Sequence, residues 1–289
     1  MAIFVQVSEA NLPLFPRLLS RIHHPRNTYA VHFDASIPDA ALSPVLATLA
    51  ATPAYAANVV VMERAPLTYR GVSLVLNTLD AMEVALSSAT PWTYWLNLSG
   101  SDYPLLPITT QRRLLADPLV ARKPRTFFTT TLTPATATIQ HDRLGYLFLD
   151  PALADFGDAS PAALNATARR SATARGAAAA TATAPAAAAA AGLTPILADA
   201  ATGAAASSPL YASTAGALGT AEAWMILHRG FVAYAARGAA ARRSLMAFAY
   251  AADAAEHYFV SLYVRWLVRL ADGDLTLGPG DCDGSGNCS

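Results

Sequence analysis

The chain has 289 residues, a formal net charge of +0 and an apolar fraction of 54%, much of it alanine. This length is enough for one large α/β domain, and the balanced charge excludes a nucleic-acid binder that relies on phosphate attraction. No strongly apolar run reaches the roughly 18 residues of a membrane span, and no basic stretch typical of a secretory signal precedes the first apolar run. We therefore expect a single domain over residues 1–289, either a soluble protein or the catalytic portion of a longer one.

Apolar runs and helical spacing predict that strands and helices alternate over the first hundred residues. Strands are expected at residues 3–7, 28–33, 58–62 and 93–98, and helices at residues 12–22, 39–49 and 72–86. This order predicts an α/β fold with a mostly parallel, Rossmann-type sheet and right-handed crossovers. Continuously apolar strands are typical of a sheet that helices cover on both faces.

The pattern is less regular after residue 100. A helix is expected at residues 110–115, a strand at residues 126–131 and a mixed aromatic segment at residues 142–156. Residues 166–208 are almost entirely Ala, Thr, Ser and Pro, so they lack the bulky apolar surface needed to offset ordering, and we predict a disordered insertion. A strand-like run at 219–227 and helices at 230–236, 242–250 and 256–270 follow, and a flexible tail is expected over residues 271–289.

Several familiar ligand motifs are absent from the sequence. The first strand is not followed by Gly-x-Gly-x-x-Gly, which disfavours a dinucleotide site and a methyltransferase-like Rossmann enzyme. Neither a phosphate-binding Gly-x-x-x-x-Gly-Lys-Ser/Thr loop nor a Gly-x-Ser-x-Gly elbow occurs. The six histidines show no metal-ligand spacing. Asp272 and Asp274 form an Asp-x-Asp string that could hold a cation through phosphates, but we interpret it as a solvated turn in the tail.

Four carboxylates could carry chemistry. Asp34 ends the second predicted strand and Asp102 follows the fourth, so both are expected at the carboxyl edge of the sheet, where α/β folds bind ligands. Either residue could instead be a turn residue that binds nearby backbone amides. Asp253 and Glu256 have the spacing of a helix capping box. Glu256 would then lie in the first helical turn, where the dipole favours the ionised form that a general base needs.

Six segments, in the same order and at similar spacing, carry a resemblance to a known family. They are residues 24–34, 69–73, 98–105, 149–153, 221–231 and 254–259. The most specific is Leu-Ser-Gly-Ser-Asp-Tyr-Pro-Leu at 98–105, which matches a family motif almost letter for letter. Together these segments resemble the core-2/I-branching glycosyltransferases, and most of all the plant-type, glucuronosyltransferase-like branch.

The resemblance implies a GT-A-like fold and inverting transfer of a sugar from a UDP-sugar donor. The sugar would be N-acetylglucosamine, glucuronic acid or similar, and the acceptor a hydroxyl of a glycan or glycoprotein. Glu256 matches the family's general base, and Asp34 matches a uridine contact. The remaining matches are Asp102 and Arg70 on the donor side, and Trp224, Ser101 and Tyr103 lining the acceptor cleft. No cofactor and no metal are expected, because basic side chains in this family offset the charge of the leaving diphosphate.

The sequence also departs from the family pattern. No basic residue follows Arg269, and Glu222, Ala254 and Ala255 replace residues that are usual in the family motifs. An alternative is therefore a catalytically inactive or truncated member that binds nucleotide or glycan without turnover. The resemblance further implies a Golgi lumen or membrane location, with membrane contact only through a segment absent from this chain, where no anchor or signal is visible.

Overall fold

The computed structural model describes residues 1–117, 120, 126–128, 146–148, 150–153, 193–195 and 220–271. The first part contains β1 (Ala2–Val7), η1 (Glu9–Leu14), α1 (Phe15–Ile22), β2 (Thr28–Phe33), α2 (Asp39–Ala51), α3 (Pro53–Ala56), β3 (Val59–Val61), α4 (Ser73–Leu86), β4 (Tyr94–Ser99) and α5 (Ile108–Leu115). The described remainder contains β5 (Phe127–Phe128), β6 (Tyr146–Phe148), β7 (Leu193–Pro195), β8 (Met225–His228), α11 (Arg229–Arg237), α12 (Ala239–Phe248) and α13 (Ala254–Ala271). The predicted alternation of strands and helices is confirmed.

The main sheet has six strands in the order β3-β2-β1-β4-β8-β5. Strand β1 is parallel to β2 and β4, and β2 is parallel to β3. Strands β4 and β5 both pair with β8 in antiparallel register. The predicted α/β fold with a mostly parallel sheet is therefore confirmed. The antiparallel direction of β8 was not predicted, because a short apolar run reads the same in either direction.

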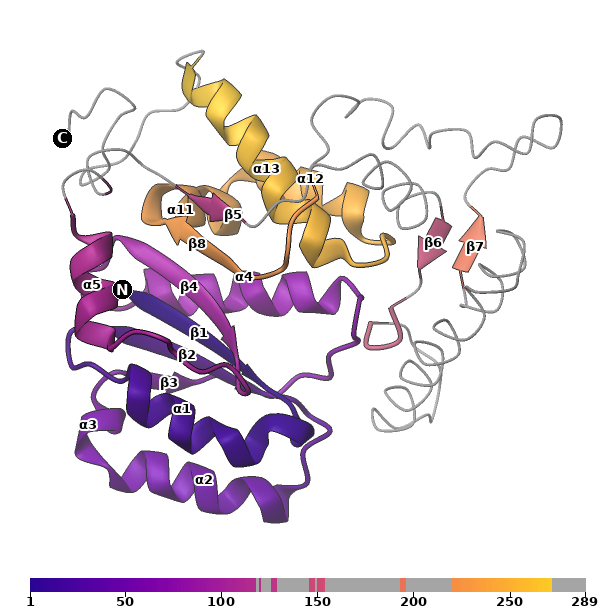
Figure 1. Ribbon diagram of the computed structural model, residues 1–289. Coiled ribbons are helices and arrows are strands. Elements are labelled where there is room, and N and C mark those ends of the chain that lie inside the picture. The colour runs from indigo at the N-terminus through magenta and orange to yellow at the C-terminus, as the bar shows by residue number, and fades with distance from the viewer. Residues whose placement is uncertain are drawn as a thin grey trace, which may run out of the picture.

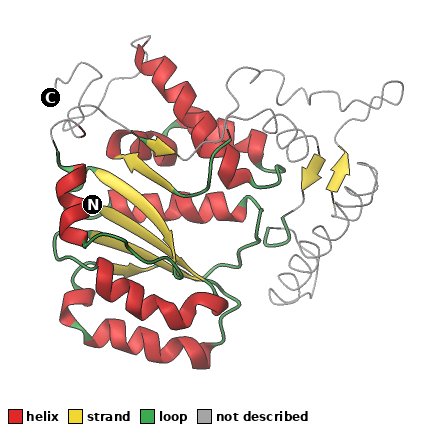
Figure 2. Ribbon diagram, viewed as in Figure 1, coloured by secondary structure: helices red, strands yellow, loops and turns green. Residues whose placement is uncertain are grey.

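Helices cover both faces of the sheet (Figure 1). Helices α1 and α2 lie on one face, and α4 with α11, α12 and α13 lies on the other, so the sheet is the middle layer (Figure 2). Each face has its own buried apolar cluster, one built around α1 and the other around α4 and α13. Since both faces of the central strands are buried, any ligand site is expected at an edge of the sheet.

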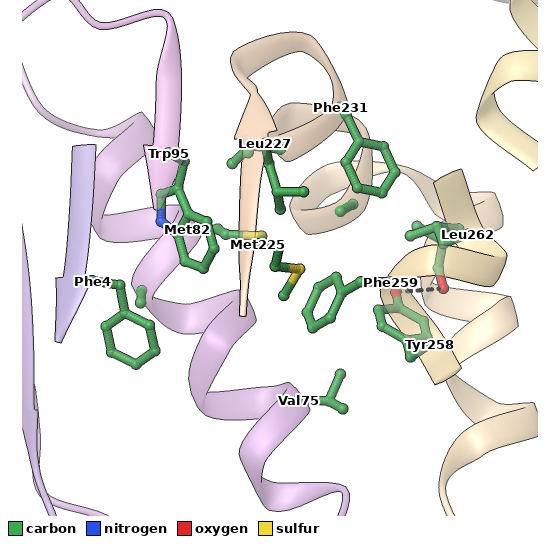
Figure 3. Close-up of a cluster of buried hydrophobic side chains, with 14 of the residues drawn as sticks. Phe4, Val75, Met82, Trp95, Met225, Leu227, Phe231, Tyr258, Phe259 and Leu262 are labelled. Carbon is green, nitrogen blue, oxygen red and sulfur yellow. Dashed lines mark hydrogen bonds between the residues drawn. The ribbon is translucent and has the colours of Figure 1, made fainter. Parts of the chain in front are cut away.

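The cluster between the sheet and the C-terminal helices anchors α13 (Figure 3). Phe4 of β1 and Trp95 of β4 stack with ring centroids 6.1 Å apart. Tyr258, Phe259 and Leu262, all at most 1% exposed, extend this cluster from α13. Complete burial of such side chains stabilises the fold by about 1.5–3 kcal/mol each, so the first two turns of α13 are held firmly against the sheet layer.

Some details of the predicted elements differ in the structure. The helix expected over residues 12–22 is divided into η1 and α1, because Pro13 and Pro16 lack the N–H groups that a continuous helix would use, whereas Pro16 suits the first turn of α1. Strand β7 lies inside the expected insertion of residues 166–208 and pairs with β6. Otherwise that insertion lies outside the described residues.

Two further predictions are only partly covered by the structure. The strand expected at residues 126–131 is described only as β5, and the tail beyond residue 271, with Asp272 and Asp274, lies outside the described residues. Among the helices that the structure describes, none combines the length and the apolar character that crossing a membrane requires.

Candidate active site

The carboxyl ends of the parallel strands bring three segments together at one edge of the sheet. The backbone N–H of Gly100, just after β4, donates to the carbonyl of Gln6 in β1 (2.8 Å), and the N–H of Asp34, just after β2, donates to the carbonyl of Val7 (2.9 Å). The amide of Asn11 in η1 donates to the Ser99 hydroxyl (3.2 Å). The start of η1, Asp34 and the turn after β4 therefore form one continuous edge.

The turn after β4 is organised around the Asp102 carboxylate. Asp102 Oδ2 accepts the Ser99 N–H (2.7 Å), and the hydroxyl oxygens of Ser99 and Ser101 are 2.9 Å apart. Gly100 is required because a Cβ at this position would lie 2.6 Å from Oδ1 of Asn11. The turn role considered for Asp102 is thus observed. Within the described chain its second oxygen, Oδ1, accepts no hydrogen bond, so it is available to a ligand.

Asp34 is nearly buried and is held by backbone groups. Its Oδ1 accepts the Ser36 N–H (2.8 Å) and its Oδ2 accepts the Leu67 N–H (3.3 Å). Arg64 stabilises the same turn by donating from Nη2 to the carbonyls of Ala35 (3.0 Å) and Ile37, and it also forms an ion pair with Asp39 (2.5 Å). Asp34 therefore joins the end of β2 to the loop of residues 62–72, which precedes α4.

His32 holds the same loop from inside the sheet. Its Nε2 accepts the Ala65 N–H (3.1 Å). Burial lowers the pKa of His32 to about 4, despite the opposing influence of the nearby Asp34 carboxylate. His32 is therefore neutral at physiological pH and serves as a hydrogen-bond acceptor.

The loop of residues 62–72 connects this edge to the start of α13. Arg70 binds the Asp253 carboxylate through Nε, 2.6 Å from each oxygen, and through Nη2. The Arg70 carbonyl accepts the Asp253 N–H (2.7 Å), and the Asp253 carbonyl accepts the Glu256 N–H (2.9 Å). Burial opposes the charge on Arg70, but hydrogen bonding to Asp253 and the charges of Asp253 and Glu256 raise its pKa. The structure therefore places Arg70 and Glu256 together, although they are far apart in the sequence.

The start of α4 depends on two of the motifs found in the sequence. The Asp150 carboxylate accepts the N–H of Ser73 (2.7 Å), which lies in the first turn of α4, where the helix dipole favours a negative charge. A Cβ on Gly71 would lie 2.1 Å from Oδ2 of Asp150. Residues 69–73 and the described part of the second motif, residues 150–153, are thus complementary parts of one contact.

Two aromatic residues of the predicted cleft are exposed. Trp224 is 43% exposed, and the buried amide of Asn97 in β4 binds the backbone on both sides of it, at the Ala223 carbonyl (2.7 Å) and the Met225 N–H (2.9 Å). Tyr103 is 46% exposed, and the Arg17 guanidinium lies 4.5 Å from the centre of its ring. Exposed aromatic faces of this kind can stack on a sugar ring.

The predicted site residues therefore fall into two groups. Asp34, Ser101, Asp102 and Tyr103 lie at the strand ends, and the loop of residues 62–72 links Asp34 to the second group, Arg70 and Glu256. The backbone on both sides of Trp224 is hydrogen-bonded to Asn97 of β4. Asn97 and the ion pair of Asp253 were not predicted from the sequence, although a lone amide inside an apolar strand was a usable signal.

A cavity of about 720 Å³ lies between β3 and α4, bordered by residues 60–67. None of the predicted site residues lines it. Across the described ranges, three His, Cys, Asp or Glu side chains nowhere gather as a metal site would require.

Part of the chain is similar in sequence to one known enzyme family. Residues 1–117 match the model of the Core-2/I-Branching enzyme family. These residues include β1, β2, β4 and the strand-end groups described above. This first part of the chain is therefore similar to the Core-2/I-branching enzymes. The members named below are glycosyltransferases.

Two curated relatives illustrate the similarity. Beta-glucuronosyltransferase GlcAT14C of Arabidopsis thaliana is 38% identical over 92 residues, which cover 32% of this chain and 24% of that protein. Beta-1,3-galactosyl-O-glycosyl-glycoprotein beta-1,6-N-acetylglucosaminyltransferase 3 of Bos taurus is 36% identical over 92 residues, which cover 32% of this chain and 20% of that protein. The match thus spans about a quarter or less of the length of these relatives.

Proposed function

We propose that this chain transfers a sugar from a UDP-sugar donor to a hydroxyl group of a glycan or glycoprotein acceptor, with inversion at the anomeric carbon. The observation that carries the proposal is the meeting of two groups of residues through the loop of residues 62–72. This loop binds the Asp34 carboxylate at one end and the Asp253–Glu256 segment at the other. A donor at the strand ends and a base at the start of α13 are the two parts that such a transfer needs.

Glu256 is the proposed general base. It lies in the first turn of α13, where the helix dipole favours an ionised carboxylate. An ionised carboxylate on a rigid helix can remove the proton of the acceptor hydroxyl as that oxygen attacks the anomeric carbon. The bond from the sugar to the diphosphate breaks as the new glycosidic bond forms on the opposite face, which inverts the configuration.

The strand-end residues are proposed to bind the donor and the acceptor. Asp34 and the open oxygen of Asp102 offer acceptors for the hydroxyls and N–H groups of a UDP-sugar. Trp224, Ser101 and Tyr103 are proposed to contact the acceptor sugar, because an aromatic face and a hydroxyl are suited to a carbohydrate ring. The donor requires no metal in this proposal, and the family resemblance supports a proposed location in the Golgi lumen or membrane.

The experiment that tests the base is Glu256→Gln, which keeps the shape of the side chain and removes its basicity. We expect kcat to fall by roughly 10²–10⁴-fold, the usual contribution of a general base, while the Kd for UDP stays unchanged. Glu83→Gln is the matched control, since Glu83 lies on α4 in an exposed ion pair with Arg237.

Three results would separate the alternatives. Full transferase activity in Glu256→Gln would contradict the role of Glu256. Wild-type protein that binds UDP and turns over no UDP-sugar would instead support a family member that binds nucleotide without catalysis. A loss of activity in Glu83→Gln equal to that in Glu256→Gln would point to a general defect of folding.

A further inference from the structure

Arg70 and Asp253 share an unusual backbone conformation. Among the described residues other than glycine, only these two have positive φ angles, 73° for Arg70 and 55° for Asp253. Such a conformation is unfavourable for residues with a side chain, and it persists where surrounding contacts impose it, often at functional sites. Here the two residues bind each other, across 183 positions of sequence.

The contacts between the two residues form a rigid unit. Arg70 binds the Asp253 carboxylate through two nitrogens, and its backbone carbonyl accepts the Asp253 N–H. The side chains are only 23% and 7% exposed. An Arg–carboxylate pair with this geometry is directional, and removing one partner from a poorly solvated pair leaves an unpaired charge.

This unit is directly joined to the proposed base. The Asp253 carbonyl accepts the Glu256 N–H (2.9 Å), and the Glu256 carbonyl accepts the Ala221 N–H (2.9 Å). On the other side Tyr258 and Phe259 are buried in the apolar cluster. Glu256 therefore lies between an ion pair and a packed anchor, which together fix the direction of the first turn of α13.

The geometry points to the Arg70–Asp253 ion pair as a positioning device for Glu256: it orients the first turn of α13 and compensates the Asp253 charge beside the proposed base. This role rests on the proposed function of Glu256. It differs from the nucleotide contact expected for Arg70, because the guanidinium faces Asp253 in this structure.

Several ionisable groups surround this end of α13. Tyr69 and Arg70 come from the loop before α4, and Asp253 and His257 from the α13 segment, where the His257 Nδ1 lies 3.2 Å from the Thr220 hydroxyl. The Asp150 carboxylate accepts a hydrogen bond from the first turn of α4. Arg70 is therefore the cation that the described loop places next to two carboxylates, Asp253 and Glu256.

The charge arrangement predicts shifts of opposite sign in the pH profile of kcat. Arg70→Gln removes the positive charge beside the Asp253 and Glu256 carboxylates, which moves the acid limb of the kcat profile to higher pH. In Asp253→Asn the Arg70 charge is no longer balanced by Asp253 and stabilises the ionised form of Glu256 more strongly, so the acid limb of the kcat profile moves to lower pH. The double variant returns the limb toward the wild-type position, because both charges are removed.

The experiment measures kcat, KM and UDP affinity for the full chain and these variants. We expect kcat of Arg70→Gln to fall about tenfold, with partial rescue in Arg70→Lys and a Kd for UDP within about twofold of wild type. Asn tolerates positive φ, so Asp253→Asn keeps the backbone. Arg237→Gln, which breaks the exposed ion pair with Glu83, is the matched control and is expected to leave kcat and the profile unchanged.

Two results would overturn the inference. One is an acid limb that stays at the wild-type pH in both single variants. The other is a loss of UDP affinity in Arg70→Gln with kcat unchanged, which would make Arg70 a nucleotide contact.

A titration without substrate separates this inference from the proposed function. The chain contains five glutamates, so the ¹³C carboxyl signal of Glu256 can be assigned by its loss in Glu256→Gln. Opposite shifts of its titration midpoint in Arg70→Gln and Asp253→Asn would support the device even if no UDP-sugar is turned over. Unshifted midpoints would refute it whatever the activity.

Discussion

Buried polar side chains at the edge of this sheet bind backbone groups and thereby shape the site. Asp34 holds the loop before α4, Asp150 holds the start of α4, and Asn97 holds the segment around Trp224. A buried backbone group without a partner is costly, so each of these side chains is needed for a local conformation that the chain would not otherwise keep. The role that we propose for them is the placement of neighbouring residues.

Asn97 allows a clear test of this view. Asn97→Leu removes the partners of the Ala223 carbonyl and the Met225 N–H, and we expect it to lower the free energy of unfolding by about 1–3 kcal/mol. Asn77→Leu is the matched control: Asn77 is equally buried, at 5% exposed, but in the described structure its Nδ2 has no partner. Its replacement is expected to cost about 0.5 kcal/mol or less.

Urea unfolding of both variants, with the m-value checked for two-state behaviour, measures the difference. An equal loss of stability in the two variants would contradict the role of the Asn97 hydrogen bonds. Weaker binding of an acceptor glycan by Asn97→Leu, at unchanged UDP affinity, would further link this residue to Trp224.

Individual site residues were predictable where their position follows from the end of a strand. Asp34 and Asp102 could be placed at the carboxyl edge because Asp34 directly follows an apolar run and Asp102 lies in the short polar turn after another. The ion pair of Arg70 with Asp253 could not be predicted, since it depends on two left-handed backbone positions and on the packing of α13 against the sheet layer. Spacing alone gave Asp253 only a capping role.

At the scale of elements, the parallel half of the fold followed from the sequence. Strand β2 has the predicted bounds, and β1 and α4 begin within one residue of their predicted starts, because alternating apolar runs and helical spacing are strong local signals. The order and direction of β8 could not be predicted, since they depend on tertiary packing. The division of η1 from α1 was readable from Pro13 and Pro16.

At the scale of the whole molecule, two parts far apart in sequence form one layered structure. Residues 1–117 carry the family match, whereas Trp224 and Glu256 belong to the segment that packs β8 and α11–α13 against that sheet. The proposed donor site lies in the first part and the proposed base in the second. The proposed function therefore depends on the interface between them, which includes the Arg70–Asp253 pair and the cluster of Figure 3.

The stability of this structure is expected to depend on pH through His32. Its pKa is about 4 in the folded state against 6.5 as a free side chain, so the unfolded chain binds the proton more readily. Stability is fully present above pH 6.5 and falls as the pH drops toward 4, by about 3 kcal/mol from this residue. His32→Gln should show a smaller loss over the same range.

Urea unfolding of both proteins at several pH values between 4 and 7 measures this dependence. The difference between the two curves isolates His32 from the carboxylates, which titrate in both proteins. Parallel curves would show that His32 contributes nothing to the acid sensitivity.

A calorimetric titration of the folded chain with UDP, first in EDTA and then with Mg²⁺ or Mn²⁺, is the decisive experiment for the proposed donor site. We predict saturable binding in EDTA, because the proposed donor site uses side chains and backbone groups alone. Binding only with metal would contradict the metal-free donor site, and the absence of binding under both conditions would contradict the proposed transferase.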